Sequence, residues 1–335
     1  MSALIVQHCG AGTSLQDGGR LGWQRFGISP SGAMDRVSLA LANALAGNAR
    51  HACALEFTLI GGAFVVDGGP VRVALAGADC SLRISGRAIP LLTSVTAWAG
   101  EIIEVGTARS GLFAYLAIGG GFDTEPDLGS RSLQSRAGLG GIDGRALRAG
   151  DRVPVGAFML SGSERMLNAP DPESGPIRVM LGPQDDYFTS GGLNALLGGT
   201  FAITPEADRM GFRLSGPRIE HGPKGYNIIS DGIATGAIQV PGSGQPIILL
   251  ADRQTTGGYP KIATVISADL ARLSQLRPGS QLTFLTVSRE QAVEAARRLE
   301  AKLVAAIAAM AHADGNLLSS ERLLGLNMVS GVVRG

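Results

Sequence analysis

The chain has 335 residues, 45% of them hydrophobic and 17% charged, which is enough apolar material for a large core and for two domains. Its formal net charge of +1 argues against a nucleic-acid surface, which needs a concentrated basic stripe. Its 49 glycines, spread between short apolar runs, are typical of a β protein with many turns. The composition therefore predicts a mainly β protein with no nucleic-acid partner.

Residues 1–160 are predicted to form a first domain of short strands and turns around one helix. Apolar residues at steps of three and four predict that helix over Ala33–Ala46, and Gly47 is the expected residue after its end. The strands expected in this half are Ala63–Val66, Val71–Leu75, Ser81–Ile84, Ile102–Val105 and Leu112–Ala117.

Residues 161–176 form the predicted linker, because they hold several prolines and glycines and show no periodicity. The second predicted domain, residues 177–335, begins with a strand at Ile177–Leu181. Ser288–Gln291 is a capping box that starts a long amphipathic helix, which Asp314-Gly315 is expected to end. We expect the apolar tail after it to dock on a core or on a partner.

The cysteines and the apolar runs predict where the protein works. Cys9, Cys53 and Cys80 form no CxxC pair, as expected for reduced thiols in a cytosolic protein. The amino-terminal residues lack the basic start and apolar run of a signal peptide. The longest apolar run, Leu303 to Ala311, is too short to cross a bilayer. We therefore expect a cytoplasmic protein that does not enter a membrane.

The segment Ser230–Ile262 concentrates polar side chains in an unusual way. Pro246–Ala251 is predicted to be a buried strand, and it ends at the sequence Asp-Arg-Gln-Thr-Thr of residues 252–256. The glycines at 257 and 258 then make a turn. A fold has little need for five consecutive hydrogen-bonding side chains at the exit of a buried strand. The segment therefore predicts a ligand site.

Several common chemistries lack their motif in this chain. The sequence contains no GxxxxGK[ST] loop for nucleotide phosphates, no GxSxG nucleophile elbow and no HExxH zinc motif. Its four histidines are isolated from one another, so no metal site is expected. The chain carries no self-contained enzyme signature.

An ordered set of motifs nevertheless resembles one family. The motifs are Ser14–Arg20, Phe26–Asp35, Leu41–Asn48, Leu55-Glu56, Gly77–Asp79, Ala108–Gly111, Gly129–Ser132, Gly138–Gly141, Leu181–Asp185, Asp208–Leu214 and the segment Ser230–Ile262. In this order they resemble the biotin-dependent carboxyltransferase family, which includes the carboxyltransferase part of urea amidolyase and the C subunit of bacterial 5-oxoprolinase. Gly18-Gly19 departs from the family pattern, in which a bulkier residue usually precedes Gly-Arg.

The resemblance implies two cyclophilin-like β-barrel domains with a few helices and a ligand cleft where they meet. It implies a cyclophilin-fold partner similar to the B subunit of 5-oxoprolinase, together with the A subunit of that enzyme or with a biotin carboxylase and its carrier. The chain has no biotin-accepting Met-Lys-Met sequence and no ATP-grasp glycine loop. We therefore expect no covalently bound cofactor: any carboxybiotin would come from another chain, and the complex would use the ATP.

Transfer of a carboxyl group to nitrogen, or opening of a lactam, needs a base, donors for an oxyanion and exclusion of water. Gln254 is an amide suited to a urea, lactam or ureido ring, or it satisfies turn backbone. Asp252 and Tyr259 could act as base and relay, or Asp252 could cap a turn. Lys261 could stabilise an oxyanion, or be an ordinary solvated lysine. These four are the candidate catalytic residues.

The candidate substrate-binding residues lie in two parts of the chain. In the first part, Arg20 could hold a carboxylate with two parallel hydrogen bonds. Asp35 opens a helix whose N–H groups favour an anion, or it is an ordinary acid of the first turn. The full set is Gln16, Arg20, Ser31, Met34, Asp35, Gln239, Thr255, Gly257 and Gly258.

The leading functional hypothesis is a carboxyltransferase-type subunit of a multi-subunit enzyme, similar to the C subunit of the ATP-hydrolysing 5-oxoprolinase, which converts 5-oxoproline to glutamate. One alternative is a biotin-dependent carboxyltransferase of the urea carboxylase or urea amidolyase type. The other is a non-catalytic regulatory subunit that antagonises a kinase inhibitor. In each case the ligand or partner is bound by a complex rather than by this chain alone.

Overall fold

The computed structural model describes residues 2–160, 162–171 and 173–313. The first half of the chain forms two sheets, with strand orders β11-β1-β4-β9-β6-β7 and β2-β3-β10-β5-β8. The first sheet consists of β1 (Ala3–Cys9), β4 (Gly62–Asp67), β6 (Leu82–Ile84), β7 (Arg87–Ile89), β9 (Ile102–Val105) and β11 (Arg152–Pro154). The second consists of β2 (Ser14–Gln16), β3 (Ala54–Thr58), β5 (Val71–Gly77), β8 (Ser94–Ala97) and β10 (Phe113–Ile118).

These two sheets pack face to face around one apolar core. Phe57 on β3 and Phe64 on β4 have ring centroids 5.8 Å apart, so side chains of the two sheets meet there. The middle strand β10 is buried along its whole length. Since alternate residues of a strand point to opposite faces, Leu116 joins this core while Tyr115 joins the core on the other face, which α1 (Arg36–Ala46) covers.

The helix α1 starts later than the sequence predicts. Ser31 and Gly32 have φ values of 54° and 84°, which end any helical path there. Asp35 is the N-cap, because its Oδ1 accepts from the backbone N–H groups of Val37 and Ser38 at 3.0 Å each. Gly47 ends the helix at φ 84°, as predicted.

The second half forms an eight-stranded sheet of order β21-β14-β15-β18-β17-β20-β13-β22. The two outer strands of this order are consecutive in the chain, so the sheet curls into a nearly closed barrel. Phe201 and Phe284 meet inside it with ring centroids 5.8 Å apart. The strands are β13 (Ile177–Leu181), β14 (Phe201–Ile203), β15 (Gly211–Ser215), β17 (Ala237–Gln239), β18 (Ile247–Leu249), β20 (Lys261–Val265), β21 (Gln281–Leu282) and β22 (Phe284–Thr286).

Short elements complete the second half. A small ribbon pairs β16 (Asp231–Gly232) with β19 (Thr256–Gly257). The helices are α2 (Ser190–Gly198), α3 (Leu270–Ser274) and α4 (Arg289–Ala308). One-turn 3-10 helices occur at η1 (Gln24–Phe26), η2 (Asp185–Tyr187) and η3 (Ser267–Asp269). None of the described helices is both long and apolar enough to cross a membrane.

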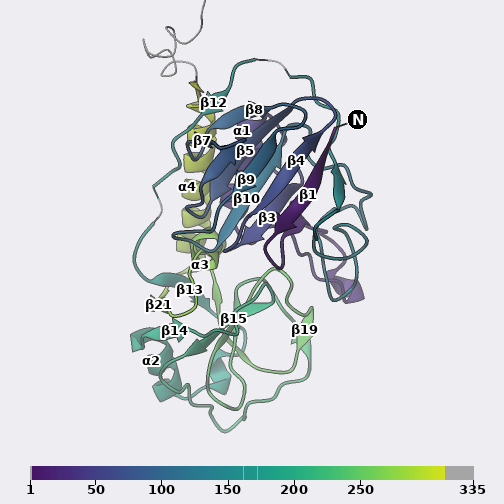
Figure 1. Cartoon of the computed structure of the whole chain (residues 1–335). Coiled ribbons are helices and arrows are strands. Elements are labelled where there is room, and N and C mark those ends of the chain that lie inside the picture. The colour runs from purple at the N-terminus through teal and green to yellow at the C-terminus, as the bar shows by residue number, and fades with distance from the viewer. Residues whose placement is uncertain (1, 161, 172, 314–335) are drawn as a thin grey trace, which may run out of the picture.

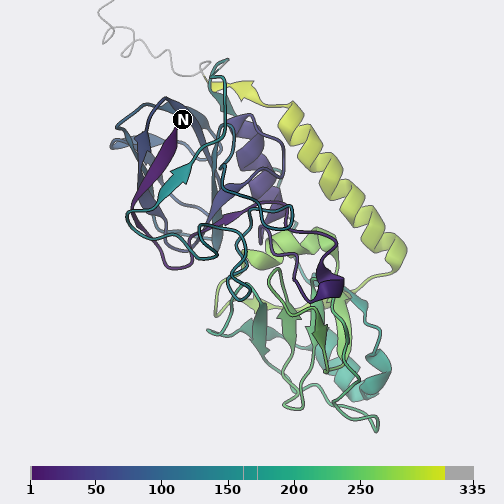
Figure 2. The same cartoon turned by 90° about the vertical axis from the view of Figure 1, so that its right-hand side faces the viewer.

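The last helix returns to the first half. Figure 1 shows the two halves one above the other, and Figure 2 shows α4 running back beside the first half and α1. Glu300 on α4 receives two hydrogen bonds from Arg50, at 2.6 and 2.9 Å. Beyond α4, β23 (Ala311–His312) pairs with β12 (Arg165–Met166), a strand inside the predicted linker. The chain therefore crosses between the halves twice.

The expected mainly β fold with a few helices is confirmed, and each strand predicted in the first half is present within two residues of its expected bounds. The capping box is also confirmed: Gln291 N–H donates to Ser288 Oγ at 3.2 Å, and Ser288 N–H to Gln291 Oε1 at 2.8 Å. The predicted helix end at Asp314-Gly315 and the apolar tail lie outside the described residues. The domain limits at residues 160 and 177 stay a prediction.

Replacing Ser288 by Ala should lower the free energy of unfolding by about 1 kcal/mol, because it leaves the Gln291 N–H without its acceptor. Urea denaturation would measure this loss. The matched control is Ser243→Ala, at an exposed turn serine, which should change stability by less than about 0.5 kcal/mol. Equal effects of the two substitutions would show that the capping box does not stabilise α4.

Candidate functional site

A buried ion cluster around Arg209 joins the two halves. Arg209, just before β15, donates from Nε to Asp252 Oδ2 at 2.8 Å and from Nη1 to the carboxylate of Glu56. Its Nη2 donates to the carbonyl of Gly32 at 2.7 Å. Glu56 and Gly32 belong to the first half, while Asp252 follows β18 in the second. One guanidinium thus fixes how the halves meet, with its charge balanced by two acids.

The cluster extends through Glu56 to the start of α1. The second oxygen of Glu56 accepts from the Tyr115 hydroxyl at 2.6 Å and from the N–H of Met34 at 3.0 Å. The Tyr115 oxygen in turn accepts from the N–H of Asp35 at 2.8 Å. Burial, with the nearby charges of Glu56 and Asp35, raises the pKa of Tyr115. Burial alone would lower the pKa of Arg209, but Glu56 and Asp252 raise it, so Arg209 stays charged.

A second polar cluster lies on the ribbon of β16 and β19. Lys261 is 3% exposed, and its Nζ donates to Asp231 Oδ2 at 2.8 Å. The Gln184 side chain accepts from the Lys261 N–H at 3.2 Å and donates to Asp231 Oδ2 at 3.2 Å. The hydrogen bond from Lys261 lowers the pKa of Asp231. Lys261 is therefore a buried, paired amine rather than a solvated surface lysine.

Two carboxamides lie beside this amine. Gln254 Nε2 donates to Gln239 Oε1 at 3.3 Å, and Gln239 Nε2 donates to the Tyr259 carbonyl at 3.3 Å. Gln239 is buried and Gln254 exposed, so the pair runs from the interior to the surface. A Cβ at Gly257 would lie only 2.6 Å from Gln239 Nε2, so a larger residue there would displace the Gln239 carboxamide. We call Gln184, Asp231, Gln239, Gln254 and Lys261 the amide–lysine site.

The remaining predicted residues of this segment shape the rim of the amide–lysine site. The Thr255 carbonyl accepts from Ile233 N–H at 3.0 Å, and the Gly258 carbonyl accepts from Ile228 N–H at 2.9 Å. The Tyr259 side chain is 41% exposed. Thr255 and Gly258 thus use their backbone to hold the neighbouring loop, while the Tyr259 side chain is accessible to a ligand.

Gln16 and Arg20 lie elsewhere, where they hold an irregular loop of the first half. Gln16 Nε2 donates to the Leu133 carbonyl at 3.3 Å, and Arg20 Nη2 to the Ser132 carbonyl at 2.6 Å. Both side chains are buried. Gln16 Oε1, Arg20 Nη1 and Ser31 Oγ are buried without a hydrogen-bond partner among the described residues. The Arg20 guanidinium thus donates to the carbonyls of a loop, and its predicted role of holding a carboxylate stays a prediction.

The predicted residues lie in three places. Asp252, Met34 and Asp35 belong to the Arg209 cluster, and Gln16, Arg20 and Ser31 lie at the irregular loop of the first half. Gln239, Gln254 and Lys261 belong to the amide–lysine site, with Tyr259, Thr255, Gly257 and Gly258 at its rim. Asp252 is paired with Arg209, which favours a supporting role over that of a free base. The catalytic and binding roles of all these residues stay predictions.

Four residues of these clusters were missed by reasoning from the sequence. Glu56 could have been found, because an acid inside the apolar strand β3 must have a buried partner. Arg209 and Gln184 lie within the family motifs, but nothing local in the sequence marks them. Asp231 lies inside the polar segment, 30 residues before Lys261, and only the pairing of β16 with β19 brings it there.

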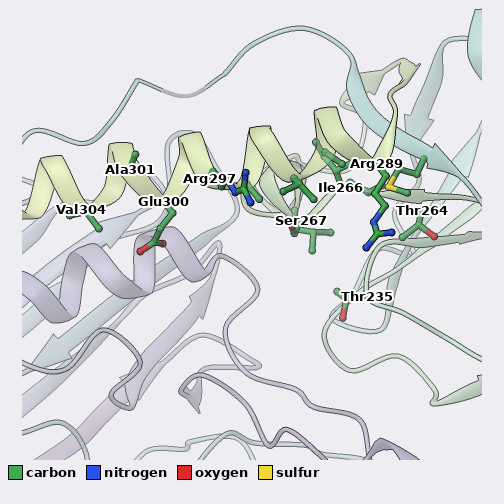
Figure 3. A pocket seen from close by; sticks show the side chains of 15 residues that line it. Thr235, Thr264, Ile266, Ser267, Arg289, Arg297, Glu300, Ala301 and Val304 are labelled. Carbon is green, nitrogen blue, oxygen red and sulfur yellow. The ribbon is translucent and has the colours of Figure 1, made fainter.

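A large hollow among the described residues lies in a different place. It is a groove of 830 Å³ between α4 and the second-half sheet, and its lining is mainly apolar (Figure 3). Polar side chains among its lining include Thr235, Thr264, Arg289, Arg297 and Glu300. None of the predicted site residues lines it. We place the candidate site at the two carboxamides and the lysine, because a polar small molecule needs converging hydrogen-bonding groups, whereas most of the surface of this groove is apolar.

The protein has a mainly β fold in two halves, and two carboxamides lie beside a buried amine, because Gln239 on β17 pairs in register with Lys261 on β20. These side chains offer donors and acceptors that match those of an amide. Among the residues described here, no group of His, Cys, Asp and Glu could hold a metal ion. The family "Carboxyltransferase domain, subdomain A and B" matches residues 26–286. The chain belongs to this carboxyltransferase-domain family, whose subdomains are cyclophilin-like.

Relatives of the chain occur both as single subunits and inside longer polypeptides. It is 36% identical over 294 residues to the 5-oxoprolinase C subunit of Escherichia coli (strain K12), covering 87% of this chain and 94% of that protein. The structure of TTHA0988 matches with a TM-score of 0.77 and 34% identity, over 85% of this chain and 55% of that one. The Kluyveromyces lactis urea carboxylase matches with a TM-score of 0.83 and 28% identity, over 90% and 29%.

Replacing Arg209 by Met should lower the free energy of unfolding by about 3–5 kcal/mol, because it leaves the carboxylates of Glu56 and Asp252 buried and unpaired. Chemical denaturation would measure the change. The matched control is Arg152→Met, which breaks an exposed pair with Asp67 and should cost less than about 1 kcal/mol. A small loss for Arg209→Met would contradict the role of the cluster in joining the halves.

Proposed function

We propose that this chain is the carboxyltransferase-type subunit of a multi-subunit enzyme that acts on a small amide or lactam, most specifically 5-oxoproline, which the complex converts to glutamate with ATP. The carboxamide pair of Gln239 and Gln254 beside the buried Lys261 carries the proposal. The 36% identity to the 5-oxoprolinase C subunit, over 94% of that protein, supports this substrate. The proposed partners are the other two kinds of 5-oxoprolinase subunit, the cyclophilin-fold B subunit and the A subunit.

The proposed roles follow from donors, acceptors and charge. An amide or lactam presents one carbonyl acceptor and one N–H donor, which Gln239 and Gln254 can both match. Lys261, which Asp231 holds in place, provides a positive charge that would stabilise the oxyanion forming on the substrate carbonyl. Because Lys261 is buried, this electrostatic stabilisation is stronger than it would be in water. Tyr259 at the rim is the proposed proton relay. Asp252, through Arg209, positions the segment that carries these groups.

The chemistry of the site also suits a ureido ring, which is a cyclic urea with the same donors and acceptors. Carboxybiotin, when another chain presents it, supplies an activated carboxyl group. Gln239 and Gln254 are the residues that would hold its ring. This supports the second candidate function, a carboxyltransferase of the urea carboxylase type, as does the similarity to the Kluyveromyces lactis urea carboxylase.

The test is to produce the chain with the subunits encoded beside it and to measure ATP-dependent release of glutamate from 5-oxoproline. Gln254→Ala and Lys261→Met should each lower kcat about 100-fold or more, because each removes a group that contacts the reacting amide. Size-exclusion chromatography should show an intact complex in both variants. The matched controls, Gln281→Ala and Lys302→Met, lie outside the amide–lysine site and should keep full activity.

Three results would redirect this proposal. Absence of glutamate release with all subunits present would exclude 5-oxoproline as the substrate. Loss of activity on adding avidin would show that carboxybiotin is the donor and would favour the urea carboxylase type. Partner binding that persists in Gln254→Ala without any turnover by the wild type would favour the non-catalytic regulatory subunit.

A further inference from the structure

Arg253 carries a buried positive charge that only neutral groups solvate. Its side chain is 3% exposed. Nε donates to the Ile233 carbonyl at 3.1 Å, Nη1 to the Leu250 carbonyl at 3.4 Å and Nη2 to Gln24 Oε1 at 3.3 Å. No carboxylate of the described residues forms an ion pair with it. Arg209, in contrast, has two acids around its guanidinium.

A buried cation without a counter-charge is costly for a fold. Burial, together with the positive charge of Arg36, lowers the pKa of Arg253 from its ordinary value to about 10. The group therefore remains charged at neutral pH. Because the pKa is lower in the folded state than in the unfolded state, the cost is present at every pH below about 10 and is relieved only as the pH rises through that value. An anion bound beside Arg253 would relieve it at neutral pH.

Arg253 lies next to the amide–lysine site. It directly precedes Gln254 in the chain. The residue that links the two places is Ile233, whose carbonyl accepts from Arg253. A Cβ at Gly257 would lie 2.8 Å from Ile233 Cδ1 and 2.6 Å from Gln239 Nε2, so the Ile233 side chain and the Gln239 amide approach each other at Gly257. The Arg253 guanidinium thus bonds to the backbone of Ile233, the same residue whose side chain lies close to the Gln239 carboxamide.

A carboxamide from the first half covers the guanidinium. Gln24, on the short helix η1, accepts from Arg253 with Oε1 and donates with Nε2 to the Ile233 carbonyl at 2.7 Å. The neighbouring side chains Leu21 and Phe26 are exposed, so Gln24 lies close to the surface of the first half. The Gln24 oxygen is a neutral acceptor, and a carboxylate oxygen in its place would be a stronger partner for the guanidinium. A carboxylate would take this position by displacing the Gln24 side chain.

We propose that Arg253 binds the carboxylate of the ligand whose amide binds Gln239 and Gln254, and that the Gln24 side chain yields its place to that carboxylate. The ligand class is therefore an anionic amide or lactam, a small molecule with an amide and a carboxylate, rather than neutral urea. This inference rests on the proposed function for the amide half of the ligand. It makes Arg253 a determinant of substrate specificity, with two of its five N–H donors still unused by the bonds above.

The test compares an acid with its uncharged amide. Calorimetric titration of the assembled complex should show that 5-oxoproline binds about 10- to 100-fold more tightly than 5-oxoprolinamide, the gain expected from a charge-assisted hydrogen bond. In Arg253→Gln the two should bind within about threefold of each other, and Arg253→Lys should fall between. The matched control, Arg148→Gln at an exposed arginine, should keep the preference. Gln24→Ala should strengthen binding of the acid and leave the amide unchanged.

Equal binding of acid and amide by the wild type would overturn the inference, and so would an undiminished preference in a folded Arg253→Gln. If Arg253→Gln does not fold, unchanged binding of the acid by Gln24→Ala overturns it instead. Failure of the proposed substrate is a separate result. If the complex neither binds nor turns over 5-oxoproline, the same comparison is made between N-carbamoylglycine, which is anionic, and methylurea, which is uncharged. Tighter binding of N-carbamoylglycine that Arg253→Gln abolishes would still support a carboxylate site at Arg253.

Discussion

The pairing of Arg209 with Glu56 and Asp252 is the interaction on which the rest of this structure depends. It joins the interior of a strand in the first half to the end of a strand in the second. Because both acids are almost fully buried, neither could lose its partner without leaving a charge in a medium of low dielectric constant. The relative position of the halves is therefore specified by charge and geometry, in addition to the apolar contacts around them.

The segment after Asp252 is fixed in space by this pairing. Asp252 is held against the first half, Arg253 points to the Ile233 and Leu250 carbonyls, and Gln254 meets Gln239. The side chains of these three consecutive residues thus contact three different surroundings, as the turn after β18 allows. Of the residues that follow β18, Asp252 supports the junction between the halves, Arg253 carries a charge without a counter-ion among the described residues, and Gln254 presents a carboxamide. A ligand with two polar ends suits this arrangement better than a ligand with one.

The sequence predicted the local features well, because each depends on residues close together in the chain. The capping box at Ser288 is set by a hydroxyl and an amide three residues apart, and Gly47 by the left-handed turn that ends α1. The start of α1 was predicted too early, since no periodicity reveals the left-handed backbone at Ser31. For Arg20, which was predicted to hold a carboxylate, no local pattern revealed that its guanidinium binds the carbonyls of a loop about 110 residues away.

By itself, the sequence determined that this is a mainly β chain with the motifs of a carboxyltransferase domain, and it predicted that the segment Ser230–Ile262 carries the ligand chemistry. Composition and short-range patterns suffice for that, because turns, caps and strands are set by neighbouring residues. Only the tertiary structure decided which charges are balanced. Glu56 and Arg209 are 153 residues apart, and their meeting depends on how two barrels pack. The same packing leaves Arg253 among neutral groups, which no local pattern could reveal.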